Sequence, residues 1–277
     1  MTTTNSKRLA TKIRSTFAFK SLPFSKDLDA DQLLSGPHVV RALDRLRYLV
    51  DRRGIGAVFG APGTGKSTLL RAFMASLGKS THAVCYLDHT TCAILDLHRE
   101  IARGFQLEPG FRRADVMSAT KERLLKLSRS KKIRPVLIID EAHLLPPGFL
   151  DEVRILANFD ADGRDEMTII LAGQPQLESN LGLAVNEAFA QRIVSKIRLR
   201  SFHPDEVAHY LDFRLQLAGR TAALFLPEAV EAIARGSRGV ARLIDRIAEQ
   251  SLIAAVENNR KEIDAELVTL AIDEVDP

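Results

Sequence analysis

The sequence predicts an α/β fold, in which a mostly parallel sheet of five strands is followed by a small bundle of helices. Two patterns support this prediction. Five short β-rich runs alternate with segments of helical spacing up to about residue 200, and only helical patterns follow. Strands that alternate with helices form open parallel sheets covered on both faces. The five runs are 55–60, 83–88, 135–140, 167–173 and 195–200.

The spacing of apolar residues predicts the individual elements of the sheet region. The run PVLIID at 135–140 is apolar nearly throughout, which is typical of a strand covered on both faces. A helix is predicted after the first run, because apolar residues recur there at helical spacing and Gly78 then ends the pattern. These apolar residues are Leu69, Leu70, Phe73 and Leu77.

The segment after residue 200 is predicted to form the helical bundle. Pro204 stands at a first helical position and Gly219 ends that helix, and Pro227 and Gly236 repeat the same arrangement. The segments GVARLIDRIAEQSLIAAVENN and DAELVTLAIDEV are then predicted to be two further helices. We therefore divide the chain into a basic N-terminal arm (1–36), a core (37–200) and a helical lid (201–277).

Composition indicates an ordinary globular protein. Of 277 residues, 45% are hydrophobic and 27% are charged. No apolar run approaches the roughly 18 residues that span a bilayer, and the N-terminus has no apolar stretch of the signal-peptide type. We therefore expect a cytoplasmic location. Cys85 and Cys92 are expected to be packing residues, because no metal-ligand spacing surrounds them.

Positive charge is concentrated in two segments, although the net charge is only +4. Residues 1–26 contain six Lys and Arg side chains and no acid, and a second basic cluster runs from Arg112 to Arg134. Clustered basic residues bind the phosphates of nucleic acids. Solvated helix faces and a disordered tail are the alternative interpretation of these clusters.

The segment GAPGTGKS, directly after the first run, is a P-loop motif (GxxxxGKS) between a strand and a helix. Its glycines allow backbone N–H groups to turn inward toward phosphates, and the following helix N-terminus adds partial positive charge. We expect Lys66 to bind the β- and γ-phosphates of ATP and the Ser67 hydroxyl to ligate Mg²⁺. The predicted nucleotide-binding residues are Gly60, Ala61, Pro62, Gly63, Thr64, Gly65, Lys66, Ser67 and Thr68.

The segment VLIIDEAH provides the acids of a hydrolysis site. Asp140 ends a predicted strand and is expected to hold Mg²⁺ through water, and Glu141 is placed to polarise the attacking water. An acidic pair that caps a strand–helix loop is the structural alternative. The P-loop earlier in the chain favours the catalytic interpretation.

Three further polar residues are candidates for the catalytic site. Gln174 follows the fourth run, where we expect it to contact the γ-phosphate or the attacking water, unless it is a turn residue before a proline. Arg192 precedes the last run and is expected to reach a nucleotide in a neighbouring subunit, unless it is a surface residue. Arg242 opens a lid helix and is expected to lie over the phosphates of its own subunit, with Arg238 as the rival candidate.

Taken together in this order, the segments GAPGTGKS, VLIIDEAH, LAGQ, AFAQRI and GVAR resemble those of AAA+ ATPases. The resemblance covers about residues 37 to 275. The segments LPFSKDL, SGPHVVRALDRLRYLVDRRG and LAGQPQL are similar to those of the ExeA-like group, which includes transposition ATPases of the TniB, IstB and TnsC kind. Gln174 departs from the Asn, Ser or Thr common at its position, which puts a sensor role for it in question.

The resemblance implies rings or helical filaments of identical subunits with ATP between them. Transposition members bind duplex DNA and recruit a DDE transposase, which is the function we expect here. The secretion relatives carry a transmembrane segment and an envelope-binding domain after the ATPase. We identify neither in this sequence, and this difference weighs against secretion. A secretion or signalling ATPase that acts on proteins without DNA is kept as the alternative.

The predicted DNA-binding residues lie after the second run. Thr90 and Thr91 offer hydroxyls and backbone N–H groups to phosphates, and Arg112 and Arg113 offer charge near a helix N-terminus. Solvated loop charges are the alternative for the two arginines. Because phosphate contacts do not read bases, we expect weakly sequence-selective binding to duplex DNA.

Overall fold

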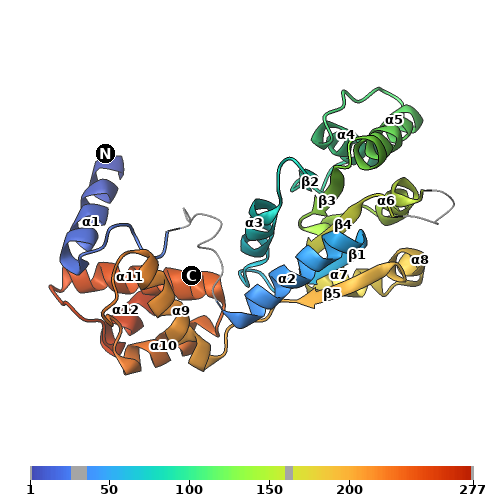
Figure 1. Ribbon diagram of the computed structural model, residues 1–277. Helices are drawn as coiled ribbons and strands as arrows, with labels where there is room; N and C mark the ends of the chain where they lie inside the picture. The colour runs from blue at the N-terminus through green and yellow to red at the C-terminus, as the bar shows by residue number, and fades with distance from the viewer. Residues whose placement is uncertain (1, 26–35, 160–164, 276–277) are drawn as a thin grey trace. The chain divides into compact units, whose positions relative to one another are not determined.

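The computed structural model describes residues 2–25, 36–159 and 165–275, which form two compact units (Figure 1). We call them the sheet unit and the helical unit. The sheet unit comprises His38–Pro62 and Lys66–Leu199, and the helical unit comprises Met1–Pro37, Gly63–Gly65 and Arg200–Pro277.

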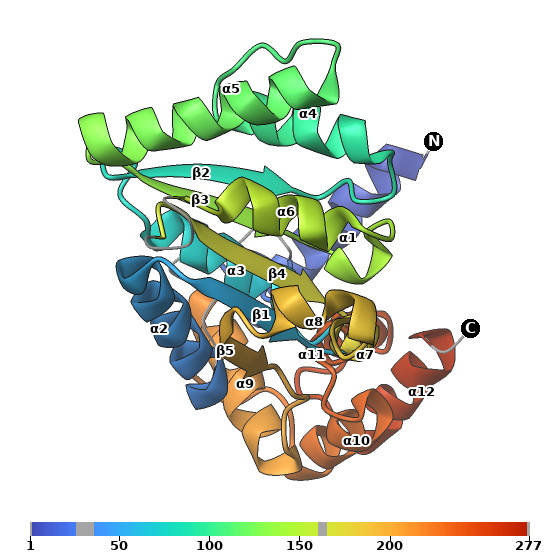
Figure 2. The same cartoon turned by 90° about the vertical axis from the view of Figure 1, so that its right-hand side faces the viewer.

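The sheet unit contains the predicted five-stranded parallel sheet. Its strands are β1 (Ile55–Phe59), β2 (His82–Leu87), β3 (Arg134–Ile139), β4 (Thr168–Gly173) and β5 (Ile193–Arg198). Figure 2 shows their order across the sheet, β2-β3-β4-β1-β5, and each of the four pairings is parallel. The carboxyl ends of all five strands therefore lie along one edge of the sheet, which we call the carboxyl edge.

Helices cover the two faces of this sheet, as the continuous apolar character of its central strands predicts. The helices of the sheet unit are α2 (Pro37–Arg52), α3 (Lys66–Ser76), α4 (Ile94–Gly104), α5 (Arg113–Leu125), α6 (Phe149–Ala157), α7 (Pro175–Leu181) and α8 (Glu187–Ala190). On one face, Leu97, Phe149 and Leu177 of α4, α6 and α7 pack with strand residues such as Leu137 and Leu171. Shorter turns are η2 (Lys126–Ser130), η3 (Ala142–Leu144) and η5 (Ala184–Asn186).

The helical unit contains the four predicted lid helices and a fifth from the N-terminus. They are α1 (Thr2–Phe17), α9 (Pro204–Leu217), α10 (Pro227–Ser237), α11 (Ala241–Glu257) and α12 (Ala265–Val275). In the described part of the chain, no helix is both long and apolar enough to cross a membrane.

The N-terminal segment differs from the separate basic arm that we predicted. Ile13, Phe17, Phe19 and Phe24 are buried in the same apolar core as the lid helices. The basic residues of α1 described by the structure occupy its exposed side, so charge dominates the composition while a few apolar residues determine the packing.

A buried arginine of α9 fixes the end of this segment. Arg214 donates from Nε to the carbonyl of Pro23 at 2.8 Å and from Nη2 to the carbonyl of Ser25 at 2.9 Å. Its Nη1 lies 3.0 Å from the Asp245 carboxylate. This ion pair offsets the free-energy cost of burying the charged guanidinium, because an unpaired buried charge is strongly destabilising. Residues 18–25 therefore belong structurally to the lid.

Candidate nucleotide site

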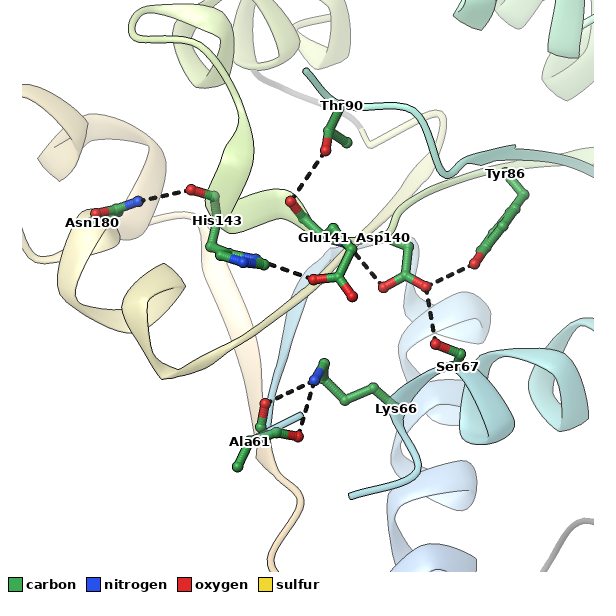
Figure 3. Close-up of polar contacts among 10 residues, drawn as sticks. Ala61, Lys66, Ser67, Tyr86, Thr90, Asp140, Glu141, His143 and Asn180 are labelled. Atoms are coloured by element: carbon green, nitrogen blue, oxygen red, sulfur yellow. Dashed lines mark hydrogen bonds and ion pairs between the residues drawn. The ribbon is translucent and has the colours of Figure 1, made fainter. Parts of the chain in front are cut away.

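The P-loop begins where β1 ends. Gly63 and Gly65 have φ angles of +79° and +96°, a conformation that glycine adopts without the steric cost of a Cβ. Lys66 begins α3, and its side chain is buried. The ammonium group donates to the carbonyls of Gly60 at 2.8 Å and Ala61 at 3.2 Å (Figure 3). These carbonyls hold the lysine charge at the loop to which phosphates are expected to bind.

Asp140 stands at the end of β3 and meets the P-loop helix. Ser67 Oγ donates to Asp140 Oδ2 at 3.3 Å, and Asp140 is only 4% exposed (Figure 3). A carboxylate and a hydroxyl are hard oxygen ligands, which Mg²⁺ prefers, and it commonly uses one or two carboxylates together with substrate phosphates. Among the described residues, no group of three or more His, Cys, Asp or Glu side chains could hold a metal ion. The Ser67 hydroxyl and the Asp140 carboxylate fit Mg²⁺ bound together with a nucleotide, whose phosphates supply further oxygen ligands.

Glu141 is fixed by contacts of its backbone. It has φ 48° and ψ 36°, a left-handed conformation that is costly for a residue other than glycine and typical of functional sites. Its N–H donates to Asp140 Oδ1 at 2.9 Å, and its carbonyl accepts a hydrogen bond from Thr90 Oγ1 at 3.2 Å. The carboxylate Oε2 lies 3.3 Å from Nδ1 of the buried His143. The side chain thus stays partly exposed while its main chain is held.

Gln174 lies on the same carboxyl edge. It directly follows β4, which is between β3 and β1 in the sheet, and it is the N-cap residue of α7. Its half-buried side chain makes no capping hydrogen bond. The position agrees with a contact to the nucleotide or water, and that role stays a prediction.

Arg192 lies at the opposite edge of the sheet. It immediately precedes β5, which pairs in parallel with β1 from Ile55↔Ile193 onward. Its Nη2 lies 3.7 Å from Asp165 Oδ1, just before β4. The five residues of β1 separate the two edges by about 16 Å at ~3.3 Å per residue. The position fits the prediction that Arg192 acts on a nucleotide of another subunit.

Arg242 and Arg238 both lie in the helical unit. Arg242 is the second residue of α11 and has an exposed side chain, and its backbone N–H donates to the carbonyl of Gly63 at 3.2 Å. Arg238 is also exposed and caps α10 in a left-handed conformation with φ 49°. Their roles over the phosphates stay predictions.

The four predicted DNA-binding residues have different environments. Thr91 and Arg112 are exposed, and Arg112 is the N-cap of α5. Arg113 is half exposed and pairs with Glu152 at 3.3 Å. Thr90 is 2% exposed, and its hydroxyl is used in the bond to the Glu141 carbonyl. We therefore assign Thr90 to the support of Glu141 instead of to DNA.

Sequence reasoning missed Tyr86, whose hydroxyl donates to Asp140 Oδ2 at 2.7 Å (Figure 3). The alternation of side chains along β2 could have indicated that Tyr86 lies outside the core. Cys85 and Leu87 are buried, and Tyr86, between them, points to the other face. The strand register pairs Tyr86 with Ile138, two residues before Asp140. The strand order was needed to see that the tyrosine and the aspartate share a face.

Comparisons with known proteins agree with this geometry. Residues 49–181 match the family model described as an AAA domain. General secretion pathway protein A of Aeromonas hydrophila is 31% identical over 264 residues, which cover 94% of this chain and 48% of that protein. The chain thus spans about half the length of this curated relative.

Solved structures show the same fold. Cdc6p from Pyrobaculum aerophilum has a TM-score of 0.70 and 23% identity, over 91% of this chain and 70% of that one. The Aeropyrum pernix ORC1 protein, solved in complex with DNA, has a TM-score of 0.67 and 16% identity, over 91% and 68% of the two chains. The fold is therefore that of an AAA+ P-loop NTPase with a parallel five-stranded sheet.

Proposed function

We propose that this chain is a Mg²⁺-dependent ATPase whose complete active sites form between identical subunits. The observation that carries the proposal is the 3.3 Å bond between Ser67 and Asp140, which joins the P-loop to the acidic strand end. Lys66 and Glu141 flank this pair. Arg192 lies at the opposite edge of the sheet, where it pairs with Asp165, and we assign it to the nucleotide of a neighbouring subunit.

Each residue has a distinct task in the proposed reaction. Lys66 exchanges its two carbonyl partners for the β- and γ-phosphates. Ser67 and Asp140 hold Mg²⁺, which neutralises charge on the phosphates when bound. Glu141 orients water and accepts its proton, and Arg192 of a neighbour stabilises the charge of the transition state.

Replacing Arg192 by alanine is expected to reduce hydrolysis by about 10³-fold or more, the range found for arginine fingers, while ATP binding by the monomer is unchanged. The reason is that the phosphate contacted by Arg192 lies in another subunit. Steady-state phosphate release and equilibrium binding of a fluorescent ATP analogue measure the two effects. Arg154→Ala, which removes an i,i+3 pair with Asp151, is the matched control.

Mixing subunits tests whether Arg192 acts between them. A mixture of Glu141→Gln and Arg192→Ala subunits forms some interfaces that pair an intact Glu141 with an intact Arg192, so activity should reappear. A mixture that stays as inactive as its two components contradicts action between subunits.

We further propose that the assembly binds duplex DNA in an ATP-dependent manner and regulates target selection by a DDE transposase. Two exposed residues support the DNA surface, Arg112 at the N-terminus of α5 and Thr91 after β2. The resemblance to transposition ATPases supports the partner. Among proteins of the same fold, the Aeropyrum pernix ORC1 protein is one solved with DNA.

A protein partner without DNA is the second candidate. Its support is the 31% identity to general secretion pathway protein A across 94% of this chain. ATP-dependent retention on duplex DNA at low salt distinguishes the two candidates. Retention supports the transposition proposal, and its failure in the wild-type protein leaves the protein-partner proposal.

Replacing Arg112 and Arg113 together by alanine is expected to weaken DNA binding while ATP affinity is unchanged. Loss of one to two phosphate contacts should reduce the slope of log affinity against log salt by about 0.9 to 1.8. The single variants should differ, because Glu152 already neutralises Arg113, so Arg112→Ala should cause most of the loss. Fluorescence anisotropy of a labelled duplex across a salt series measures these effects.

The controls for this experiment follow from the fold. Arg260→Ala removes an exposed arginine paired with Asp264 in the helical unit and should bind DNA like wild type. Deletion of residues 1–26 would remove core residues such as Phe17, so Lys7→Ala/Arg8→Ala tests the basic N-terminal segment instead. If neither this variant nor the Arg112/Arg113 variant differs from wild type, the proposed DNA surface is wrong.

A further inference from the structure

The Asp140 carboxylate is held by three hydrogen bonds. Oδ1 accepts from the Glu141 N–H at 2.9 Å, and Oδ2 accepts from Ser67 at 3.3 Å and Tyr86 at 2.7 Å. The Tyr86 bond is the shortest, and its length is that of a strong bond between a hydroxyl and a carboxylate. The donors come from the backbone after β3, from α3 and from β2, so elements far apart in the sequence fix the orientation of this acid (Figure 3).

The position of Tyr86 follows from the topology of the sheet. β2 stands at the end of the sheet formed by the described strands, next to β3, and its alternation places Cys85 and Leu87 in the core on one face. Tyr86 lies on the other face and is 37% exposed. Its hydroxyl nevertheless reaches the carboxyl edge, where Asp140 follows β3.

The Tyr86 hydroxyl is placed to act as the donor in this bond. It lies 2.7 Å from Asp140 Oδ2, and an ionised carboxylate can only accept, so the O–H group donates. Ser67 is itself an expected Mg²⁺ ligand, whereas Tyr86 is the donor whose task is confined to the carboxylate. Residues that orient a metal-binding carboxylate typically contribute 10- to 100-fold to metal affinity or activity.

We propose that Tyr86 is a positioning residue, whose hydroxyl orients the Asp140 carboxylate and thereby sets the affinity of the nucleotide site for Mg²⁺. This inference rests on the proposed ATPase function. It adds a residue from the second strand to a site otherwise formed by the P-loop and the end of β3.

Tyr86→Phe tests the proposal, because it removes the hydroxyl and keeps the ring. The affinity for a fluorescent ATP analogue is measured at equilibrium in EDTA and across a Mg²⁺ series. Mg²⁺ is expected to increase the affinity for the ATP analogue. In the variant, the Mg²⁺ concentration that gives half of this increase should rise about tenfold or more, while the affinity for the analogue in EDTA stays at the wild-type value. Tyr48→Phe is the matched control, because Tyr48 is 63% exposed and its ring contacts Arg52.

The outcomes separate this inference from the proposed function. A wild-type Mg²⁺ dependence in Tyr86→Phe, or an equal loss of affinity in EDTA and in Mg²⁺, contradicts the positioning role and leaves the proposed function intact. A melting curve in the absence of nucleotide identifies a general loss of stability. Wild-type protein that binds no nucleotide under either condition contradicts the proposed function itself.

Discussion

Lys66→Ala is expected to abolish tight ATP binding. The ammonium group makes two hydrogen bonds to P-loop carbonyls in the structure, and we expect it to make charge-assisted bonds to phosphates when ATP is bound. Such bonds contribute about 1.5–3 kcal/mol each, and ~1.4 kcal/mol corresponds to tenfold in affinity. A loss of about 10- to 100-fold per bond is therefore expected in equilibrium titrations with a fluorescent ATP analogue.

The control for this variant is Lys79→Ala, because Lys79 is an exposed lysine just after α3. It should bind the analogue like wild type. Melting curves of both variants establish that the fold is kept. Wild-type affinity in a folded Lys66→Ala protein would contradict the assignment of the P-loop as the nucleotide site.

The sheet and the nucleotide edge were predictable because local patterns determine them. The run at 55–60 became β1 (Ile55–Phe59), and the run at 135–140 became β3 with Asp140 as the next residue. In a parallel sheet, the residues that follow each strand meet at one edge. The proximity of Ser67 and Asp140, 73 positions apart, therefore followed from two motifs and one rule of topology.

Contacts between distant segments were not predictable in the same way. The bond from Arg214 to the Pro23 carbonyl joins positions 191 residues apart, and no periodicity connects these segments. A count of basic residues suggested an arm, although Phe17 and Phe24 make the segment part of a core. Composition describes the exposed surface well and says little about which few apolar residues are buried.

Side-chain pairing also separates residues that look equivalent in the sequence. Arg112 and Arg113 are adjacent, yet Arg113 faces Glu152 on α6. Thr90 and Thr91 are adjacent, yet Thr90 is buried against the Glu141 carbonyl. In each pair, one member makes a contact within the sheet unit while the other is exposed, and only the folded structure shows which is which.

Glu141→Gln is expected to retain ATP binding and to lose turnover. The amide preserves the size of the side chain and removes its basicity, so the water is no longer deprotonated, which typically costs 10²- to 10⁴-fold. The fold should be kept, because the bonds to Asp140 and Thr90 use backbone atoms of residue 141. Gln also has the same branching as Glu, so the left-handed backbone gains no new strain.

Two measurements separate loss of chemistry from loss of binding in Glu141→Gln. Steady-state phosphate release should fall to near background, whereas affinity for the fluorescent ATP analogue should equal that of the wild type. If ATP holds subunits together, assemblies of the variant should also persist longer after ATP addition, as followed by light scattering. Glu108→Gln changes an exposed acid after α4. It should leave phosphate release, affinity for the analogue and the persistence of assemblies unchanged. An unaltered phosphate-release rate in Glu141→Gln would contradict the catalytic role of Glu141, because the variant differs from the wild type only in the loss of this base.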